Sequence, residues 1–125
     1  MDVQMKDFIR LMKALSDPNR VKVIKMLQQR HMCVCELQAA LGVAQPTVSN
    51  HLKVLEDAGL VTSFKQGQWV NYSLALGETV YARTLLEHLK PWLEDDPEVA
   101  RLLGGLDAIR RENLCAAKPG GQSTL

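Results

Sequence analysis

Apolar residues recur every three or four positions over the first third of this 125-residue chain, which is the spacing of amphipathic helices. The first run covers residues 5–15. Asp17 can cap a second helix that begins directly after it. A short third helix is expected over residues 34–41, because Gly42 can adopt the left-handed conformation that often follows a helix end. The pattern therefore predicts three helices in this part of the chain.

The middle of the chain predicts a two-helix motif followed by a hairpin. Residues 45–58 place apolar side chains on one face and end at Gly59. Together with the preceding short helix and the turn between them, they predict a helix-turn-helix. Residues 60–65 and 69–74 are rich in β-branched and aromatic side chains, and Gly67 lies in the turn between them. These two segments predict a β-hairpin, the wing.

Helical spacing returns over residues 78–93 and, after a break at residues 95–97, over residues 99–109. The tail of residues 116–125 holds almost no large apolar groups, so we expect it to be disordered. The expected fold class is mainly α with a small β-hairpin (α+β), a winged helix-turn-helix. Residues 1–115 are expected to form one DNA-binding and dimerisation domain.

Composition and charge narrow this picture. Apolar residues make up 46% of the chain, which is enough for one core, but the chain is too short for two large domains. The formal net charge of +1 gives no overall attraction to nucleic acid, so DNA binding must depend on where the charges lie. No apolar run could span a bilayer, and the first 15 residues lack a signal-peptide core. We therefore expect a cytoplasmic protein without a membrane partner.

The outward face of the helix over residues 45–58 carries short hydrogen-bonding side chains that can match base edges in the major groove. Such a face alone is more often a solvated surface, but the ordered run of short helix, glycine turn, polar helix and lysine-bearing hairpin favours double-stranded DNA as the partner. For Lys65 and Gln68 in the wing, a role in keeping the turn soluble is an alternative equal to DNA contact. The predicted DNA-binding residues are Gln45, Thr47, Ser49, Asn50, His51, Lys53, Lys65 and Gln68.

Four sequence segments resemble those of the ArsR/SmtB-type metal-responsive repressors, namely ALSDPNRVKVIKML, CVCEL, QPTVSNHLKVLEDAGLV and KQGQWVNYSL. The resemblance covers roughly residues 11–74. It implies a homodimer built mainly from the first and the C-terminal helices, which binds palindromic operator DNA and releases it on binding inducer. It implies a repressor and not an enzyme. Ala44 departs from the family, which usually has a capping Ser there, a change worth ~1 kcal/mol.

The segment CVCEL is similar to the inducer site of the arsenic-responsive branch, which makes Cys33 and Cys35 the candidate ligands. Thiolates prefer thiophilic ions, which favours arsenic(III), antimony(III) or a soft divalent metal, with no organic cofactor. The branch often has a third cysteine where Gln38 stands, so the third ligand is unassigned, and Cys115 or an external thiol are candidates. The zinc- and nickel-responsive relatives use Asp and His on a late helix, where this chain offers His88 without a partner histidine.

Two residues that are two positions apart lie about 200° apart around a regular α-helix, so one ion cannot easily contact both cysteines. Binding is therefore expected to unwind this turn and, through Leu37 and Leu41, to displace the recognition helix. Three cysteines cannot form an even disulfide framework, and a reducing cytosol favours free thiols, so we do not expect structural bridges.

Other interpretations of the cysteines stay open. A Cys-x-Cys pair can be two small buried hydrophobic residues. In a redox-sensing repressor of the same fold, Cys33 and Cys35, or either of them with Cys115, would oxidise to release DNA. A small thiol enzyme would use the pair as nucleophiles, although no base or cofactor loop supports this. A winged helix that binds only proteins would need an apolar surface in place of the polar face of the recognition helix.

Overall fold

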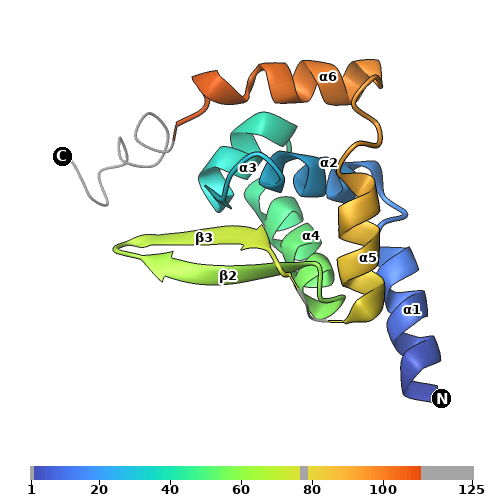
Figure 1. The fold of residues 1–125 in the computed structure, drawn as a ribbon. Coiled ribbons are helices and arrows are strands. Elements are labelled where there is room, and N and C mark those ends of the chain that lie inside the picture. Colours follow the sequence, from blue (N-terminus) through green and yellow to red (C-terminus); the bar gives the residue numbers. More distant parts are fainter. Residues whose placement is uncertain (1, 77–78, 111–125) are drawn as a thin grey trace.

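The computed structural model describes residues 2–76 and 79–110 (Figure 1). Its elements are α1 (Asp2–Ala14), α2 (Pro18–Leu27), β1 (Met32–Cys33), α3 (Val34–Leu41), α4 (Gln45–Asp57), β2 (Val61–Gln66), β3 (Trp69–Leu74), α5 (Val80–Leu89), α6 (Pro97–Gly104) and the 3₁₀ turn η1 (Leu106–Ala108). This order confirms the predicted winged helix-turn-helix. The tail of residues 116–125, with its expected disorder, lies outside the described residues.

Local signals in the sequence set the helix ends. The Asp17 carboxylate accepts the backbone N–H groups of Asn19 at 2.8 Å and Arg20 at 3.2 Å, which caps the start of α2. Gly42 follows α3 with a φ of 73° and donates its N–H to the Gln38 carbonyl at 2.8 Å. Both predicted helix boundaries are therefore confirmed.

The C-terminal helices are shorter than predicted. The helix expected over residues 78–93 extends only from Val80 to Leu89, and Pro91 follows, whose ring disfavours further helix. The helix expected over residues 99–109 ends at Gly104, and after Gly105 the chain continues as η1. Glycine costs about 1 kcal/mol relative to alanine inside a helix, and two in succession explain the interruption.

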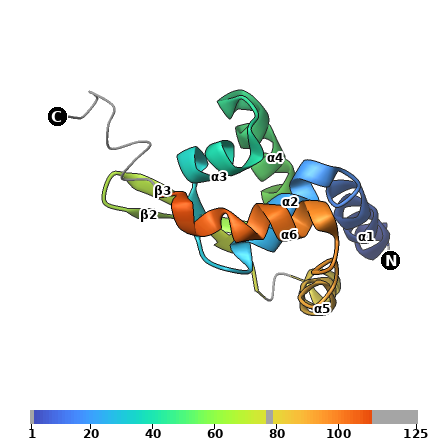
Figure 2. The same cartoon turned by 90° about the horizontal axis from the view of Figure 1, so that it is seen from above.

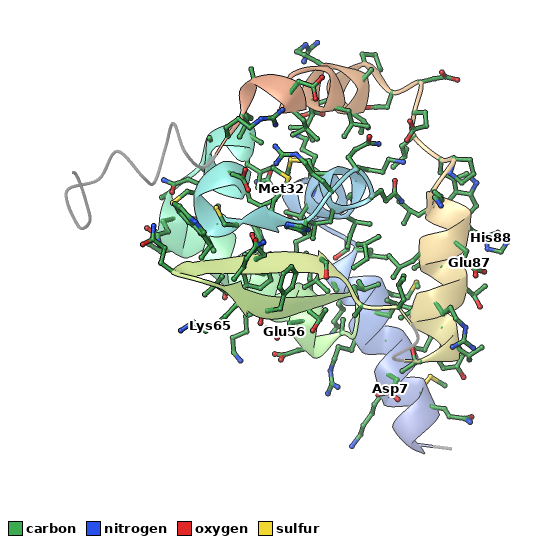
Figure 3. The ribbon with its side chains drawn as sticks, turned by 60° about the vertical axis from the view of Figure 1, so that its left-hand side comes forward. Asp7, Met32, Glu56, Lys65, Glu87 and His88 are labelled. Carbon is green, nitrogen blue, oxygen red and sulfur yellow. The ribbon has the colours of Figure 1, made fainter. Side chains whose placement is uncertain are left out.

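The sheet has one strand more than the sequence predicted. β1 pairs antiparallel with β3, through Met32 opposite Tyr72 and Cys33 opposite Asn71, and β3 pairs in turn with β2. A two-residue strand is too short to produce an alternating hydrophobic pattern. Met32 is fully buried in the interior (Figure 3). The strand matters for function because it fixes the backbone at Cys33.

The hydrophobic core surrounds α2, which packs against α3, α4, β3 and α6. Seen from above, α6 runs across α2 (Figure 2). The buried apolar residues are Leu11, Ala14, Val23, Ile24, Met26, Leu27, Met32, Leu37, Val48, Leu52, Leu55, Leu60, Val61, Ala82, Leu86, Leu89 and Leu106. No helix in the described part of the chain is long and apolar enough to cross a membrane.

Three basic side chains, two from α2 and one from the loop after it, each reach the carbonyl end of another helix. Arg20 donates to the carbonyls of Lys13 (3.2 Å) and Ala14 (2.7 Å). Lys25 donates to those of Leu89 (3.2 Å), Lys90 (3.2 Å) and Trp92 (2.8 Å). Arg30 donates to those of Leu106 (3.3 Å) and Ile109 (2.7 Å). Cations at helix C-termini offset the negative end of the helix dipole. These three charges therefore stabilise the fold and are not available to DNA.

Candidate nucleic-acid interface and thiol site

Helix α4 presents two different faces. Val48, Leu52 and Leu55 are buried in the core, at 0%, 1% and 0% exposure. The side chains on the other side are exposed, and Lys53 lies 3.8 Å from Asp57 in an ion pair along the helix. The exposed predicted residues of this helix are Gln45, Thr47, Ser49, Asn50 and Lys53. The helix thus offers hydrogen-bonding groups in a row without an apolar surface.

His51 points the other way. Its side chain is 7% exposed, with Nδ1 3.2 Å from Arg20 Nη1 and Nε2 3.9 Å from Asp17 Oδ1. The imidazole therefore joins α4 to the start of α2, and its buried position argues against the predicted DNA contact. The sequence contained this signal, because position 51 falls on the apolar face with positions 48 and 55, at helical spacing.

The hairpin carries the remaining predicted DNA-binding residues. Lys65 and Gln68 are exposed on either side of the turn, which Gly67 makes possible with a φ of 63°. Lys65 projects from the hairpin away from the helices (Figure 3). Behind the turn, Asn71 is fully buried and donates to Gln66 Oε1 at 2.8 Å, which holds the two strands together. The exposed polar side chains of the wing therefore lie on a hairpin whose two strands are joined by this side-chain hydrogen bond.

Helix α4 begins at Ala44, whose φ of −67° and ψ of 150° suit a capping residue but whose side chain has no acceptor. Pro46 occupies the first turn and brings no N–H group. The first turn of α4 is exposed, apart from Val48 at its end. The positive end of this helix dipole therefore faces solvent, where an anion such as a phosphate would be stabilised.

Cys33 lies at the end of β1 and is the capping residue of α3, with an extended backbone (φ −88°, ψ 171°). Its thiol is free and its side chain is 3% exposed. The expectation that both cysteines occupy a regular helical turn is therefore wrong, because Cys33 precedes the helix and has an extended backbone.

Cys35 lies in the first turn of α3, where its side chain is half-buried. It is disulfide-bonded, so the expectation that the cysteines form no bridge is wrong for this residue. Three cysteines cannot all be paired, but an odd number still allows one disulfide and one free thiol. Cys115 lies outside the described residues.

Glu36 holds the start of α3 closed. Its carboxylate, 4% exposed, accepts the backbone N–H of Cys33 at 2.9 Å in a capping box and Arg30 Nη1 at 3.1 Å. Burial raises the pKa of the Cys33 thiol, and the negative charge of Glu36 raises it further. An incoming soft ion must therefore displace a proton from Cys33. Glu36 and Arg30 were not singled out from the sequence, although a glutamate three residues after a helix cap is the capping-box pattern.

Sulfur is the donor that a soft ion prefers, so the chemistry of Cys33 and Cys35 fits such an ion once both sulfurs are reduced. Within residues 2–76 and 79–110, no group of three or more His, Cys, Asp or Glu side chains could hold a metal ion. His88 lies on the outer side of α5, where Nδ1 is 2.9 Å from the Thr84 carbonyl oxygen (Figure 3). A third donor to the cysteine pair would have to come from outside the described residues.

A large apolar surface covers the sides of α1 and α5 that face away from the core. It surrounds a groove of about 420 Å³, in which Phe8 and Tyr81 meet edge to face at 5.9 Å. The exposed apolar residues of these two helices and the loop after α5 are Met5, Phe8, Ile9, Met12, Val80, Trp92 and Leu93. Of these, Phe8, Met12, Val80 and Trp92 line this groove, whereas Met5 and Ile9 line a second groove of about 510 Å³ between α1 and α4. Monomeric proteins rarely expose so many large apolar side chains.

An exposed polar helix in a helix-turn-helix, followed by a hairpin wing, defines a winged helix-turn-helix DNA-binding regulator. The family model described as "Bacterial regulatory protein, arsR family" matches residues 17–63. The arsenical resistance operon repressor of Escherichia coli (strain K12) is 32% identical over 99 residues, which cover 78% of this chain and 83% of the relative. The chain belongs to the ArsR family of bacterial regulatory proteins.

Solved structures agree with this assignment. HlyU from Vibrio cholerae N16961 matches with a TM-score of 0.60 and 29% identity, over 71% of this chain and 94% of that chain. The homodimeric winged helix-turn-helix domain of Mb0332 from Mycobacterium bovis has a TM-score of 0.62 at 24% identity, over 71% and 80% of the two chains, and shows the fold alone. The family is one of bacterial regulatory proteins and the Escherichia coli relative is a repressor, so the chain is a DNA-binding transcriptional repressor and not an enzyme.

Proposed function

We propose that this repressor binds operator DNA as a homodimer and leaves it when Cys33 and Cys35 bind arsenic(III), antimony(III) or another soft metal. The observation that carries the proposal is the position of the two sulfurs at the start of α3, the helix that packs directly against the recognition helix α4. The similarity to a repressor named for arsenical resistance supports the choice of inducer.

The DNA contacts proposed for each protomer come from α4 and the wing. The N-terminal half of α4 would enter the major groove, with its dipole directed towards a phosphate. Lys65 and Gln68 would follow the backbone or the minor groove beside it. The residues proposed to contact DNA are Gln45, Thr47, Ser49, Asn50, Lys53, Lys65 and Gln68, and His51 is left out because it packs inward.

The apolar surface of α1 and α5 supports a second copy of the chain as the partner. A second copy would bury this surface, as the predicted dimer through the first and the C-terminal helices requires. The neighbour whose title names a homodimer shares the fold. Phe8→Glu would place a charge in this surface and is expected to give a monomer in sedimentation equilibrium, whereas a variant that stays dimeric would contradict the proposed interface.

Inducer binding would act through the packing between α3 and α4. Leu37 of α3 is fully buried and belongs to the same core as Val48 of α4. When one ion draws the two sulfurs together, the first turn of α3 changes shape, and the recognition helix that packs on it moves out of register with the groove. The ion favours the released state only because it binds that state more tightly. Cys115 or an external thiol would supply the third donor.

The test uses the reduced full-length chain and DNA selected by the protein from a random pool. Fluorescence anisotropy is expected to show tight binding that arsenite reverses. Cys33→Ser should keep the DNA affinity and lose the response to arsenite, while the control Asp95→Ala, at an exposed position outside the proposed interfaces, should behave as the wild type. Normal release from the Cys33→Ser variant would contradict the proposed site.

A redox-sensing repressor of the same fold is the second candidate, because Cys35 is disulfide-bonded while Cys33 is free. In that case peroxide would release DNA from the reduced protein in the absence of any metalloid, and a thiol reductant would restore binding. Release by arsenite under reducing conditions, with no effect of peroxide, would reject this candidate.

A further inference from the structure

A line of hydrogen bonds joins the start of α3 to the last described turn of the chain. The Cys33 N–H donates to Glu36 Oε1 at 2.9 Å, and Glu36 Oε2 accepts from Arg30 Nη1 at 3.1 Å. The other arm of the guanidinium, Nη2, donates to the carbonyls of Ile109 at 2.7 Å and Leu106 at 3.3 Å. One arginine therefore contacts both the helix that carries the cysteines and the segment that follows α6.

Burial makes this line a strong link. The Glu36 side chain in this ion pair is 5% exposed and that of Arg30 is 31% exposed. A buried carboxylate without its cationic partner destabilises the fold, so Arg30 tends to move together with Glu36. The planar, forked guanidinium gives the carboxylate and the two carbonyls separate nitrogens, Nη1 and Nη2, whereas an ammonium group would have to serve all three acceptors from one atom. The identity of residue 30 as arginine thus matters beyond its charge.

A second contact holds the same C-terminal segment without touching α3. Lys22 on α2 forms an ion pair with Glu98 on α6, and the Glu98 side chain is largely exposed. A groove of about 320 Å³ beside this pair has walls from α2, from the end of α3 and from α6, and includes Lys22 and Arg101. Besides its apolar packing, the described C-terminal segment is therefore held by two basic residues, Lys22 on α2 and Arg30 in the loop after it, and of these two only Arg30 also contacts the cysteine-bearing helix.

We propose that the Arg30–Glu36 pair couples inducer binding at the start of α3 to the docking of α6 and η1. The proposal rests on the function proposed above. When an ion draws the sulfurs of Cys33 and Cys35 together, Cys33 must move, and its N–H is the group that the Glu36 carboxylate accepts. Glu36 then moves, Arg30 moves with it, and the carbonyls of Leu106 and Ile109 lose their donor. Arg30 and Glu36 are positioning residues in this device, and linkage requires that docking of the segment changes inducer affinity by the same factor.

Hydrogen exchange with mass spectrometry tests the coupling on the reduced full-length chain. The measurement uses a Cys115→Ser background, so that no sulfur beyond the described residues can tie the ion to the segment. Saturating arsenite is expected to speed exchange over residues 97–109 by about fivefold or more, the lower range of typical allosteric coupling. Arg30→Lys should show fast exchange without arsenite and no further increase. The control Lys22→Met should exchange faster at rest but keep the increase with arsenite.

X-ray absorption on the same samples counts the sulfur neighbours of arsenic and separates the two proposals. Bound sulfurs with unchanged exchange over residues 97–109 would overturn the coupling and leave the proposed function intact. Arsenic without sulfur neighbours would remove the proposed function and the coupling with it. Loss of the arsenite response in Lys22→Met as well as in Arg30→Lys would show that any weakening of the docked segment abolishes the signal and that Arg30 is not its specific link, which also overturns the proposal.

Discussion

The two helices of the helix-turn-helix begin in opposite ways. α3 begins at Cys33, which is buried, bound to the Glu36 carboxylate and backed by Arg30. α4 begins at Ala44, which offers no side-chain acceptor and is exposed to solvent. The two starts lie a single short helix apart in the sequence, yet one is closed by the protein itself and the other is left open.

This difference separates two tasks within one motif. An open helix start keeps its positive end available for a DNA phosphate, and a cap within the protein would compete with that contact. At the closed start, a buried carboxylate and its cationic partner lie beside a thiol. A ligand at the thiol therefore disturbs an ion pair whose separation costs free energy. Strong internal interactions are thus found at the helix start proposed to bind the inducer, and they are absent at the helix start proposed to contact DNA.

The largest expected effect comes from breaking the closed start. Arg30→Met takes the cationic partner from the buried Glu36 carboxylate and should lower the free energy of unfolding by roughly 3 kcal/mol, the lower range for breaking a buried pair. Urea denaturation measures the loss. The control Lys22→Met breaks a more exposed pair and should cost about 0.5 kcal/mol. Equal losses in the two variants would mean that the start of α3 is not specially held.

The open start predicts that charge near α4 matters for DNA and not for stability. Lys53→Gln should weaken binding of all sequences alike and make the slope of log affinity against log salt shallower by about 0.9, as expected for one phosphate contact. The measurement is a salt titration of DNA affinity by anisotropy. Lys90→Gln, on the exposed surface just after α5, should leave the slope as it is. An unchanged slope for Lys53→Gln would remove this residue from the interface.

The fold was predictable where the signal is local and periodic. The Asp17 cap, the turn at Gly42 and the hairpin with its turn at Gly67 all depend on residues that act within a few positions of themselves. β1 was missed because two residues carry no period, and its pairing with β3 depends on a segment about forty positions later. Gly104 and Gly105 divided the last helix against an otherwise helical pattern.

The site was predictable in position but not in conformation. The resemblance and the spacing located Cys33 and Cys35 at the start of α3, but the helical turn assumed for them failed at Cys33, because β1 extends the backbone there. The contact between Arg30 and the carbonyls of η1 bridges more than seventy positions, and periodicity does not report such contacts. His51 was predicted to contact DNA, whereas its burial follows from its place on the apolar face of α4.

A capping side chain at the start of α4 would make the two helix starts alike. Ala44→Ser adds a hydroxyl acceptor at a residue whose backbone already suits a cap, so the free energy of unfolding should rise by about 1 kcal/mol. Thermal and urea denaturation both measure it. Ala100→Ser, on an exposed position inside α6, should instead lower stability by about 0.5 kcal/mol through helix propensity. No gain from Ala44→Ser would mean that the start of α4 is already satisfied within the protein.

The smallest expected effect concerns a third helix start, that of α2, which is closed by Asp17. Burial acts to raise the pKa of this carboxyl, but the N–H groups of Arg20 and Asn19 and the charges of His51 and Arg20 outweigh it and hold the pKa below its ordinary value. A lowered folded-state pKa gives stability that is complete above the ordinary pKa and is lost as the pH falls through the folded value. Asp17→Asn should therefore reduce the loss of unfolding free energy as the pH falls below about 5, read from urea denaturation at each pH. An identical pH profile for Asp17→Asn and the wild type would show that the carboxylate charge adds nothing to this cap, and that a neutral acceptor closes α2 equally well.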